Sequence, residues 1–554
     1  MTSTQFATVD QAAADRIHER RWWTLAVLCL SLLIIGMDNT ILNVALPTIQ
    51  RDLNASASSL QWIVDAYVIV YASILLTTGS LGDRFGRKGA LNVGLLIFGL
   101  GSVAAAFAQT SGQLIAFRAV GGIGGALIMP ATLSILINVF PVHERGRAIG
   151  IWAGVSGLGI VIGPLAGGWL LEHMWWGSVF LINVPVVIAA LVAGHSLVPT
   201  SRDPHAPRLD LVGTVLGSAG LATMLYGIIE APAKGWGDST VLLGFGAGIT
   251  LIVAFLAWES YCDHPMLDIG FFRNRSFSGA SFAITLVFFA MFGSMYFLTQ
   301  YLQFVLGFST IQAGAALIPL ALTLMIAAPN SARLTRRFGT RATVSAGLTI
   351  VAVALAVMSR VTIDSGYPLI AVVLVLLGAG MGIAMSPATE SIMSSVPANK
   401  SGVGSAMNDT TRQVGGALGV AILGSLTSAA YHDAIDSSPI ASRLVGQSGA
   451  VVRDSIGGAH LVAEKVGDSA QPLLRVANAA FVDAMSSTVL IAAAVAVVGA
   501  IVAGIVLPAR TIPVVDAVDE DPEHTDHDRD SHARDEFTGH SADGRRDYAI
   551  SAGD

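Results

Sequence analysis

Long runs of apolar residues, interrupted by short polar segments, set the pattern of this sequence. A helix needs about 20 apolar residues to cross the hydrocarbon core of a bilayer, so each run of this length predicts a membrane-spanning helix. We place fourteen such spans, at about residues 22–46, 60–79, 89–107, 113–136, 147–170, 177–198, 210–230, 239–258, 277–299, 309–331, 342–360, 368–392, 402–427 and 485–507. The pattern therefore predicts an all-α polytopic membrane protein.

The composition supports this interpretation. Of the 554 residues, 53% are hydrophobic and 12% are charged, about half the charged share of a soluble domain. The two cysteines, Cys29 and Cys262, offer neither a disulfide framework nor a zinc-binding spacing. The first apolar run is long enough to span, and it follows a polar N-terminus, which argues against a cleavable signal peptide. No basic patch accompanies a soluble domain, so nucleic-acid binding has no support.

The end of the chain differs from the rest. Residues 511–554 hold 13 Asp and Glu against 4 Lys and Arg, a local charge of −9, whereas the whole chain carries −7. Such an acidic segment, with almost no aliphatic run, is typical of disorder. Metal binding by its histidines is the alternative to a solvated segment, which the composition favours; these are His524, His527, His532 and His540. We predict a disordered acidic tail over residues 508–554.

Basic residues are distributed unevenly between the loops. With the N-terminus placed inside, the inner segments hold 17 Lys and Arg, whereas the outer loops hold three, Arg51, Lys234 and Arg360. The excess of basic residues in short inner loops predicts that both termini are cytoplasmic, and an even number of spans agrees. The count omits a long outer loop over about 428–484, in which "LLRVANAAFVDAM" suggests a short hairpin or an amphipathic helix.

Two of the predicted cytoplasmic loops resemble each other. "GSLGDRFGRKG" (79–89) lies between spans two and three, and "NSARLTRRFGTRA" (330–342) lies between spans ten and eleven. Both contain Arg-Phe-Gly followed by a basic residue, but Arg336 stands where the first copy has Asp83. The repeat predicts two six-helix halves, 22–198 and 277–507, separated by two inserted helices and linkers over 199–276 and preceded by a segment 1–21. Paired halves imply a rocking transporter with its site between them.

Four stretches resemble motifs of the major facilitator superfamily. "GSLGDRFGRKG" is similar to its loop signature, and "LIAFRAVGGIGGA" (114–126) to its fourth-helix motif with a buried arginine. "GLGIVIGPLAGGWL" (157–170) resembles the fifth-helix motif of its antiporters, and "MDNTILNVALPTI" (37–49) resembles the first-helix motif of its fourteen-helix drug–proton antiporters. The match runs from about residue 22 to 508, in the expected order. It implies the major facilitator fold and a likeness to exporters of multiple drugs and quaternary ammonium compounds.

The loop signature implies a charge latch between the halves. By resemblance, the residues that carry it are Gly79, Asp83, Arg84, Gly86 and Arg87. A carboxylate at Asp83 can accept hydrogen bonds from a helix N-terminus or pair with an arginine. The alternative is that the basic residues only keep the loop inside, but Asp83 and the glycines exceed what topology needs.

The fifth-helix motif places Gly159, Gly163 and Gly167 on one helix face, where small residues allow close packing. Pro164 removes a backbone hydrogen bond and favours a kink. The resemblance implies that this helix lines the contact between the halves, with helix packing alone as the alternative. A dinucleotide-binding loop is excluded, because these glycines lie inside a span and follow no strand.

Charged residues inside the spans are the candidates for coupling. Asp38, Asp65 and Arg118 fall in the outer halves of spans one, two and four, within about one to two turns of the same depth. They could therefore share one cavity. Ionisable groups inside a membrane are rare enough to suggest a function, although a structural ion pair is the alternative. Which of the two acids carries a proton stays open.

The second half offers further candidates. Glu390 lies toward the inner end of span twelve, and Asp409 and Arg412 are three residues apart in span thirteen, so they can pair locally. The resemblance implies that an acid near Asp409 takes part in transport. Trp62 shares a helix face with Asp65, and an aromatic wall beside a carboxylate suits a lipophilic cation. The predicted substrate cavity contains Trp62, Asn43, Tyr67 and Tyr296.

These observations predict a proton-coupled antiporter that exports amphipathic, often cationic drugs or antiseptics. We expect it in the bacterial plasma membrane, as a monomer, with protons, lipophilic cations and membrane lipids as partners. It is expected to be neither an enzyme nor a metal or cofactor protein, because no Walker loop or metal motif is present. One alternative is export of an envelope lipid, siderophore or anionic metabolite, with Arg118 and Arg412 as ligands. The other is a non-transporting scaffold or sensor that uses the acidic tail.

Overall fold

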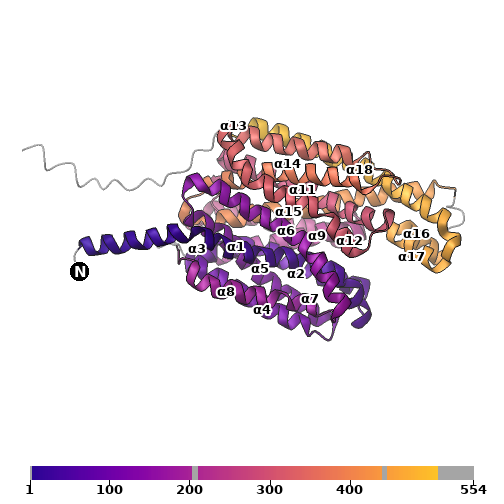
Figure 1. Ribbon diagram of the computed structural model, residues 1–554, viewed down its shortest axis with the longest axis horizontal. Coiled ribbons are helices and arrows are strands. Elements are labelled where there is room, and N and C mark those ends of the chain that lie inside the picture. Colours follow the sequence, from indigo (N-terminus) through magenta and orange to yellow (C-terminus); the bar gives the residue numbers. More distant parts are fainter. Residues whose placement is uncertain (1–2, 203–209, 440–445, 510–554) are drawn as a thin grey trace, which may run out of the picture. The chain divides into compact units, whose positions relative to one another are not determined.

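The protein is described by a computed structural model over residues 3–202, 210–439 and 446–509. In these ranges every regular element is a helix and no strand occurs, and the long helices run side by side (Figure 1). The predicted all-α fold is therefore confirmed. The acidic segment 511–554, with its four histidines, lies outside the described residues.

The first half contains six predicted spans in eight helices. They are α1 (Ser3–Asp52), α2 (Ala57–Ser73), α3 (Leu75–Phe85), α4 (Arg87–Ala106), α5 (Ser111–Val139), α6 (Val142–His173), α7 (Ser178–Leu181) and α8 (Asn183–Leu197). The second predicted span is broken at Ile74, where α2 and α3 meet at an angle of 50°. The side chain of Ser56 caps α2 and that of Thr110 caps α5, which explains where these helices begin.

The remainder of the described chain is also helical. It contains α9 (Leu211–Lys234), α10 (Ser239–Tyr261), η1 (Ile269–Arg273), α11 (Arg275–Gln300), η2 (Tyr301–Val305), α12 (Thr310–Ala316), α13 (Ile318–Met358), α14 (Tyr367–Ser394), η3 (Ala398–Lys400), α15 (Ser401–Asp436), α16 (Gly446–Asp454), α17 (Ile456–Val466), η5 (Gly467–Ala470) and α18 (Gln471–Val506). Within the segment 428–484, expected to be a loop, α15 continues to Asp436 and α18 already begins at Gln471. The short helices α16 and α17 lie between them, at the end of the bundle away from the start of α1 (Figure 1).

By length and composition, the described helices include 12 candidate membrane spans, or 13 if the bent pair α2–α3 is one span. One of the 12, Thr310–Met358, has 49 residues and contains two of the predicted spans. It is interrupted at Gly339, whose φ of 85° is not helical. Since about 20 residues cross a bilayer, this segment is long enough to cross twice. If this segment counts as two spans and the pair α2–α3 as one, the described helices include fourteen spans; this number stays a prediction.

The apolar core is divided between the two halves. One large cluster of buried side chains is built almost wholly from α11 to α18, and two others are built mainly from α1 to α8. The two inserted helices pack against each other, and α9 also contacts α2 of the first half and α15 of the second. The inserted pair is therefore attached to both halves rather than to one.

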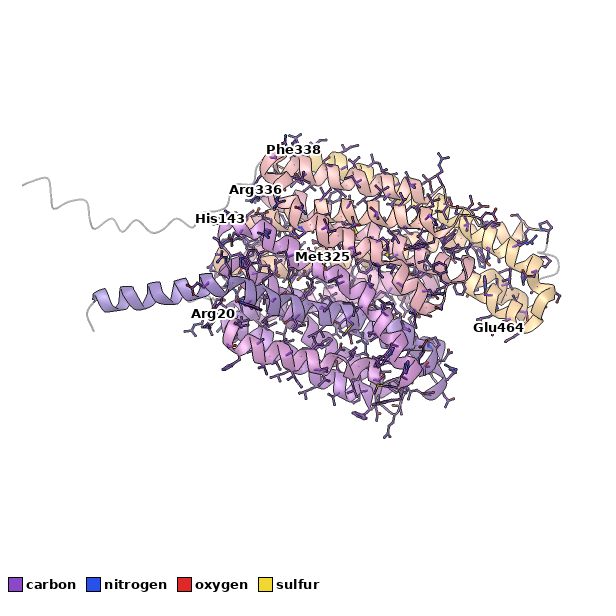
Figure 2. All side chains as sticks on the ribbon, in the orientation of Figure 1. Arg20, His143, Met325, Arg336, Phe338 and Glu464 are labelled. Carbon is purple, nitrogen blue, oxygen red and sulfur yellow. The ribbon has the colours of Figure 1, made fainter. Side chains whose placement is uncertain are left out.

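Basic residues of different loops gather at one end of the bundle. Arg20, His143, Arg336 and Phe338 all lie at this end, whereas Glu464 lies at the opposite end and Met325 between them (Figure 2). Three of the predicted inner segments thus lie at the same end of the bundle, which agrees with the charge count. We term it the predicted cytoplasmic end.

The two loop copies have the same backbone geometry. Gly86 has a φ of 109° and Gly339 a φ of 85°, both in the region that favours glycine. In each copy the next N–H donates to a carbonyl just after the last helix of its own half: Arg87 to Ser201 at 3.0 Å, and Thr340 to Ala509 at 3.1 Å. The Arg-Phe-Gly repeat is therefore a repeat of structure as well as of sequence.

Candidate functional site

Asp38 lies in α1 and is buried among helices of the first half. Nη1 of Arg118, from α5, donates to one carboxylate oxygen at 2.5 Å, and Nδ2 of Asn183, from α8, donates to the other at 2.9 Å. Arg118 also donates from Nε to the Ile63 carbonyl at 3.3 Å, and its guanidinium stands 4.3 Å from the Tyr67 ring centre. Asp38 is 1% exposed and Arg118 is 4% exposed.

This arrangement matches the predicted proximity of Asp38 and Arg118, and it adds a partner that the sequence pattern did not reveal. Asn183 binds Asp38 and Ser102 together, the latter at 3.3 Å. Buried charges need such paired and hydrogen-bonded surroundings, because their desolvation is otherwise uncompensated. The signal that was available is an asparagine inside an apolar run, which is the same kind of signal as Asp38 itself.

Asp65 does not join this network in the structure. It is only partly buried on α2, its side chain is hydrogen-bonded with Gln61, and it interacts electrostatically with Glu230 of the inserted helix α9. One turn earlier on the same helix, Trp62 stacks on Tyr226 of α9 with ring centres 6.1 Å apart. The structure therefore brings Asp38 and Arg118 together as a buried ion pair, whereas Asp65 faces an inserted helix; a cavity shared by all three stays a prediction.

A lysine completes the cluster on α9. Nζ of Lys234 pairs with Glu230 at 3.1 Å, donates to the Tyr226 hydroxyl at 3.3 Å and stands 5.7 Å from the centre of that ring. Helix α9 thus contributes both an aromatic ring, Tyr226, and charged side chains, Glu230 and Lys234, to the region around Asp65. Hydrophobic periodicity predicts α9 but cannot say which helices it contacts.

Asp409 and Arg412 lie on one face of α15, as their spacing predicted. Arg412 Nη1 is 4.0 Å from Asp409 Oδ1, and both side chains are almost fully buried. Asn408 donates to Asp409 at 3.2 Å, and Thr389 of α14 accepts a hydrogen bond from Arg412 at 3.2 Å. Tyr71 of the first half faces this group and is hydrogen-bonded with Gln413. The local ion pair is present, but it is long and touches both halves.

Glu390 lines a cavity of about 470 Å³ at the predicted cytoplasmic end, between α6, α13 and α14. Its carboxylate lies against Gly146, where an added Cβ would stand 2.6 Å from Oε2. His143 and Arg336 line the same cavity, and Glu390 interacts electrostatically with Arg145 and Arg336. The surroundings of Glu390 therefore differ from those of Asp38 and Asp409. Glu390 lines a cavity with basic residues, whereas Asp38 and Asp409 each belong to a buried ion pair.

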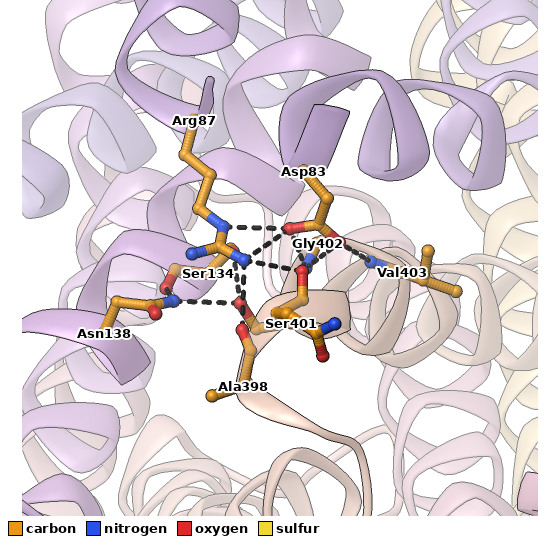
Figure 3. A network of polar contacts seen from close by, with 9 residues as sticks. Asp83, Arg87, Ser134, Asn138, Ala398, Ser401, Gly402 and Val403 are labelled. Carbon is orange, nitrogen blue, oxygen red and sulfur yellow. Dashed lines mark hydrogen bonds and ion pairs between the residues drawn. The ribbon is translucent and has the colours of Figure 1, made fainter. Parts of the chain in front are cut away.

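The predicted latch residue Asp83 bridges the halves at the same end (Figure 3). Its carboxylate accepts the Gly402 N–H at 2.8 and 2.9 Å and the Val403 N–H at 3.2 Å, both in the first turn of α15. On its other side it accepts from Arg87 Nε at 2.9 Å. Both partners expected for an acid here, a helix N-terminus and an arginine, are thus present at once. The helix dipole and its free N–H groups favour the negative charge.

Arg87 extends this contact to the second half. Its Nη2 donates to the carbonyls of Ala398 at 3.0 Å and Asn399 at 2.9 Å. Nearby, Ser134 and Asn138 of α5 bind the hydroxyl of Ser401 at 2.7 and 2.9 Å (Figure 3). Gly402 and Ser401 were not singled out from the sequence, because backbone N–H donors at a helix start leave no signature in side-chain chemistry.

The other latch residues have distinct places. A Cβ on Gly79 would stand 2.5 Å from the Gly402 carbonyl oxygen, so this glycine lets α3 touch α15. Gly86 supplies the positive φ between α3 and α4. Arg84 lies over the Phe85 ring, 5.4 Å from its centre.

The glycines of α6 form two faces. Gly159, Gly163 and Gly167 pack on Gly36, Thr40 and Ile41 of α1, in their own half. The contact with the second half is made instead by Gly150, Gly154 and Gly157, which lie against Pro329, Met325 and Leu324 of α13. Pro164 also reaches the second half, where it lies against Gly314. Gly159, Gly163 and Gly167 thus pack within the first half, whereas Pro164 and the earlier glycine row contact the second half.

Gly150 is the tightest test of this second row. A Cβ there would stand 2.5 Å from the Ala328 carbonyl oxygen and from Pro329 Cα, and backbone atoms cannot move aside as a side chain can. Gly150→Ala is expected to destabilise the protein by about 1–3 kcal/mol, the usual cost of overpacking, seen as a lower unfolding temperature of the purified protein. Gly89→Ala is the control, since nothing lies within 4 Å of its Cβ. Equal unfolding temperatures for the two variants would contradict the proposed contact.

The predicted cavity residues have different surroundings. Trp62 stacks on α9, and Tyr67 is buried beneath Arg118. Asn43 is exposed on α1, and Tyr296 is 48% exposed on α11, packed edge-to-face on Phe297. Their grouping into one substrate cavity stays a prediction.

The sequence profile described as Major Facilitator Superfamily matches residues 28–420, which is most of the chain. The chain belongs to this superfamily. Membership makes it a transport protein rather than an enzyme. The resemblance inferred from the four motifs is thereby confirmed.

Similar proteins are named as export and resistance proteins. The tetracenomycin C resistance and export protein of Streptomyces glaucescens is 35% identical and covers 89% of this chain and 93% of its own. The multidrug efflux pump LfrA of Mycolicibacterium smegmatis is 36% identical, covering 89% and 97%. The methyl viologen resistance protein SmvA of Salmonella typhimurium is 34% identical, covering 75% and 84%.

Solved structures agree on the fold. The proton:xylose symporter XylE superposes with a TM-score of 0.58 at 14% identity, covering 89% of this chain and 98% of its own. The human organic anion transporter MFSD10 gives a TM-score of 0.54 at 14% identity, covering 87% and 99%. At such identities the likeness shows the architecture and carries no information about the transported compound.

Proposed function

We propose that this major facilitator protein is a proton-coupled antiporter that exports amphipathic, often cationic compounds. The observation that carries the proposal is the position of Asp409: a buried carboxylate on α15, with Arg412 as its cation and Tyr71 of the other half facing it. A carboxylate between two moving halves can exchange one positive partner for another as the halves rock. The names of the similar proteins, which concern multidrug efflux and resistance to tetracenomycin C and methyl viologen, support the cargo class.

In this mechanism the acids act in sequence with the latch. A cation enters from the predicted cytoplasmic end and is held by a carboxylate near the contact between the halves. The Asp83 carboxylate then closes that end, because it joins α3 to the N–H groups of Gly402 and Val403 in the first turn of α15. Protonation of the carboxylate from outside removes the charge that held the cation, so release and proton entry are coupled. Asp65 and Asp409 are the proposed exchangeable acids, and Asp38 keeps its half in register through Arg118 and Asn183.

The protein is proposed to act as a monomer in the bacterial plasma membrane, with both termini in the cytoplasm and no cofactor other than the proton gradient. The gathering of Arg20, His143 and Arg336 at one end supports this orientation (Figure 2).

One observation favours a second cargo class. Nε of Arg412 is buried without a hydrogen-bond partner, so a buried cation is available to an anionic ligand. Export of an anionic metabolite, siderophore or envelope lipid would use Arg118 and Arg412 as ligands and the acids as proton sites only. The geometry favours the cationic cargo, because Arg118 is already fully paired with Asp38.

Efflux of ethidium tests the proposal. Cells that express the protein should extrude preloaded ethidium, and an uncoupler should abolish this efflux. Asp409→Asn is expected to reduce the uncoupler-sensitive rate at least tenfold, because a neutral amide can neither hold the cation nor carry the proton; a tenfold change corresponds to about 1.4 kcal/mol. Asp263→Asn, at an exposed loop position, is the control. Uncoupler-insensitive efflux, or full activity of Asp409→Asn, would overturn the proton-coupled assignment.

A further inference from the structure

The guanidinium of Arg412 lies between two aromatic rings. Its Cζ is 4.8 Å from the centre of the Trp152 ring and 5.2 Å from that of Phe288. A cation over aromatic faces is attracted by their electron density, and the attraction grows when water is excluded. Trp152 is fully buried and Arg412 is 4% exposed, so this pair of rings is a dry cation site.

The site is assembled from both halves of the molecule. Trp152 belongs to α6 of the first half, whereas Phe288 belongs to α11 and Arg412 to α15 of the second. The indole nitrogen of Trp152 donates to Thr132 at 3.2 Å, which fixes the orientation of the ring. The arginine therefore occupies a position that exists only while α6 and α15 are close together.

The polar partners of Arg412 are few for a buried guanidinium. Nη2 donates to Thr389, and Asp409 stands 4.0 Å from Nη1. Arg412 Nε and Asp409 Oδ2 are both buried without a hydrogen-bond partner. The contrast with Arg118 is direct, since Arg118 pairs with Asp38 at 2.5 Å and also binds a carbonyl. Arg412 is thus held mainly by the two ring faces and by a long ion pair with Asp409. Another cation could make the same contacts in place of the Arg412 guanidinium.

We propose that Arg412 is a tethered cation that fills the Trp152–Phe288 site when no substrate is bound, and that a monovalent lipophilic cation displaces it. The ligand class is an organic cation with spread or shielded charge, which gains the same ring contacts and the same acid, Asp409. Arg412 thereby sets specificity, because a ligand must bind better than the built-in guanidinium. This inference rests on the proposed export of cations and assigns a residue that selects among them.

Ethidium binding to the purified, full-length protein in detergent tests the inference. Arg412→Gln removes the competing cation and leaves Asp409 unpaired, so ethidium is expected to bind about tenfold tighter. Arg412→Lys keeps the charge but has no planar guanidinium to stack on the rings, and its affinity should lie between the two. In Asp409→Asn/Arg412→Gln the gain should disappear, because the acid that holds the ligand is gone. Unchanged or weaker binding by Arg412→Gln would overturn the proposal.

Two comparisons keep the result interpretable. Arg147→Gln is the matched control, because Arg147 also stands over a tryptophan ring, 5.3 Å from that of Trp22, but is exposed; its ethidium affinity should equal that of the wild type. If Arg412→Gln unfolds, as judged by its melting profile, Arg412→Lys decides alone: an affinity no higher than that of the wild type refutes the proposal. Wild-type cells that fail to extrude ethidium would refute the cation-export function, whereas tighter binding by the variants would still show a guarded cation site.

Discussion

Asp38→Asn is expected to have the largest effect of any single substitution in the protein. It would remove the negative charge that balances the buried Arg118 guanidinium, and it would replace one of the two acceptor oxygens by an NH2 group, so that Arg118 and Asn183 compete for a single acceptor. Removing one member of a buried pair typically costs 3–5 kcal/mol, so we expect destabilisation of about this size. Thermal unfolding of the purified protein should show it, and ethidium efflux should fall to the background rate.

The double variant Asp38→Asn/Arg118→Gln separates stability from coupling. Two neutral amides can hydrogen-bond to each other, so most of the lost stability should return. If Asp38 only orders its half, efflux should return as well. If Asp38 also carries the transported proton, efflux should stay at background. Wild-type stability of the single variant would show that the Asp38–Arg118 pair does not form.

Asp83→Asn is expected to open the predicted cytoplasmic end. The carboxylate accepts three hydrogen bonds from the first turn of α15 and one from Arg87, and an amide can satisfy only part of this set. Charge-assisted hydrogen bonds contribute roughly 1.5–3 kcal/mol, so the open population should rise about ten- to hundredfold. Alkylation of a cysteine introduced at Ser405, which is fully buried in α15, should accelerate in proportion.

The experiment needs Cys29 and Cys262 replaced by serine, because both are free thiols. An impermeant maleimide added to inside-out vesicles then reports opening on this side alone. Asp433→Asn is the control, since Asp433 is an exposed acid near the other end of α15. Labelling rates that are the same for Asp83→Asn and Asp433→Asn would show that Asp83 does not hold the halves together.

Apolar run length and loop charge were sufficient to predict the helical membrane architecture. The depth of Asp38, Asp65 and Arg118 along their spans predicted that the three could share one cavity, because 1.5 Å per residue converts position into depth. The structure pairs Asp38 with Arg118 only, since depth says nothing about direction around the helix bundle. Asp65 faces α9, and no pattern in the sequence indicates which helices an inserted pair will touch.

The glycines of α6 show the same limit. Spacing predicted that Gly159, Gly163 and Gly167 share a face, and they do, but the partner of that face is α1. Gly150, Gly154 and Gly157 form the face toward the second half. Gly150 and Gly154 precede the recognised motif, and Gly157 is its first residue. A period identifies a face, whereas the identity of the partner depends on three-dimensional packing. Gly402 was missed for a related reason, because its contribution is a backbone N–H.

The two Arg-Phe-Gly loops share their backbone but not their charge. The helix that Asp83 caps, α15, is the fifth span of its half, and its counterpart in the first half is α6. Arg336 stands where an acid would be needed to cap α6 in the same way, and there the structure has a cavity of about 470 Å³ instead. Ligand pockets commonly measure 300–1,000 Å³. The two copies of this repeat are therefore unequal. The contact between α3 and α15 is closed by the Asp83 carboxylate, whereas the corresponding contact between α13 and α6 contains a cavity of the size of a ligand pocket, even while the first contact is closed.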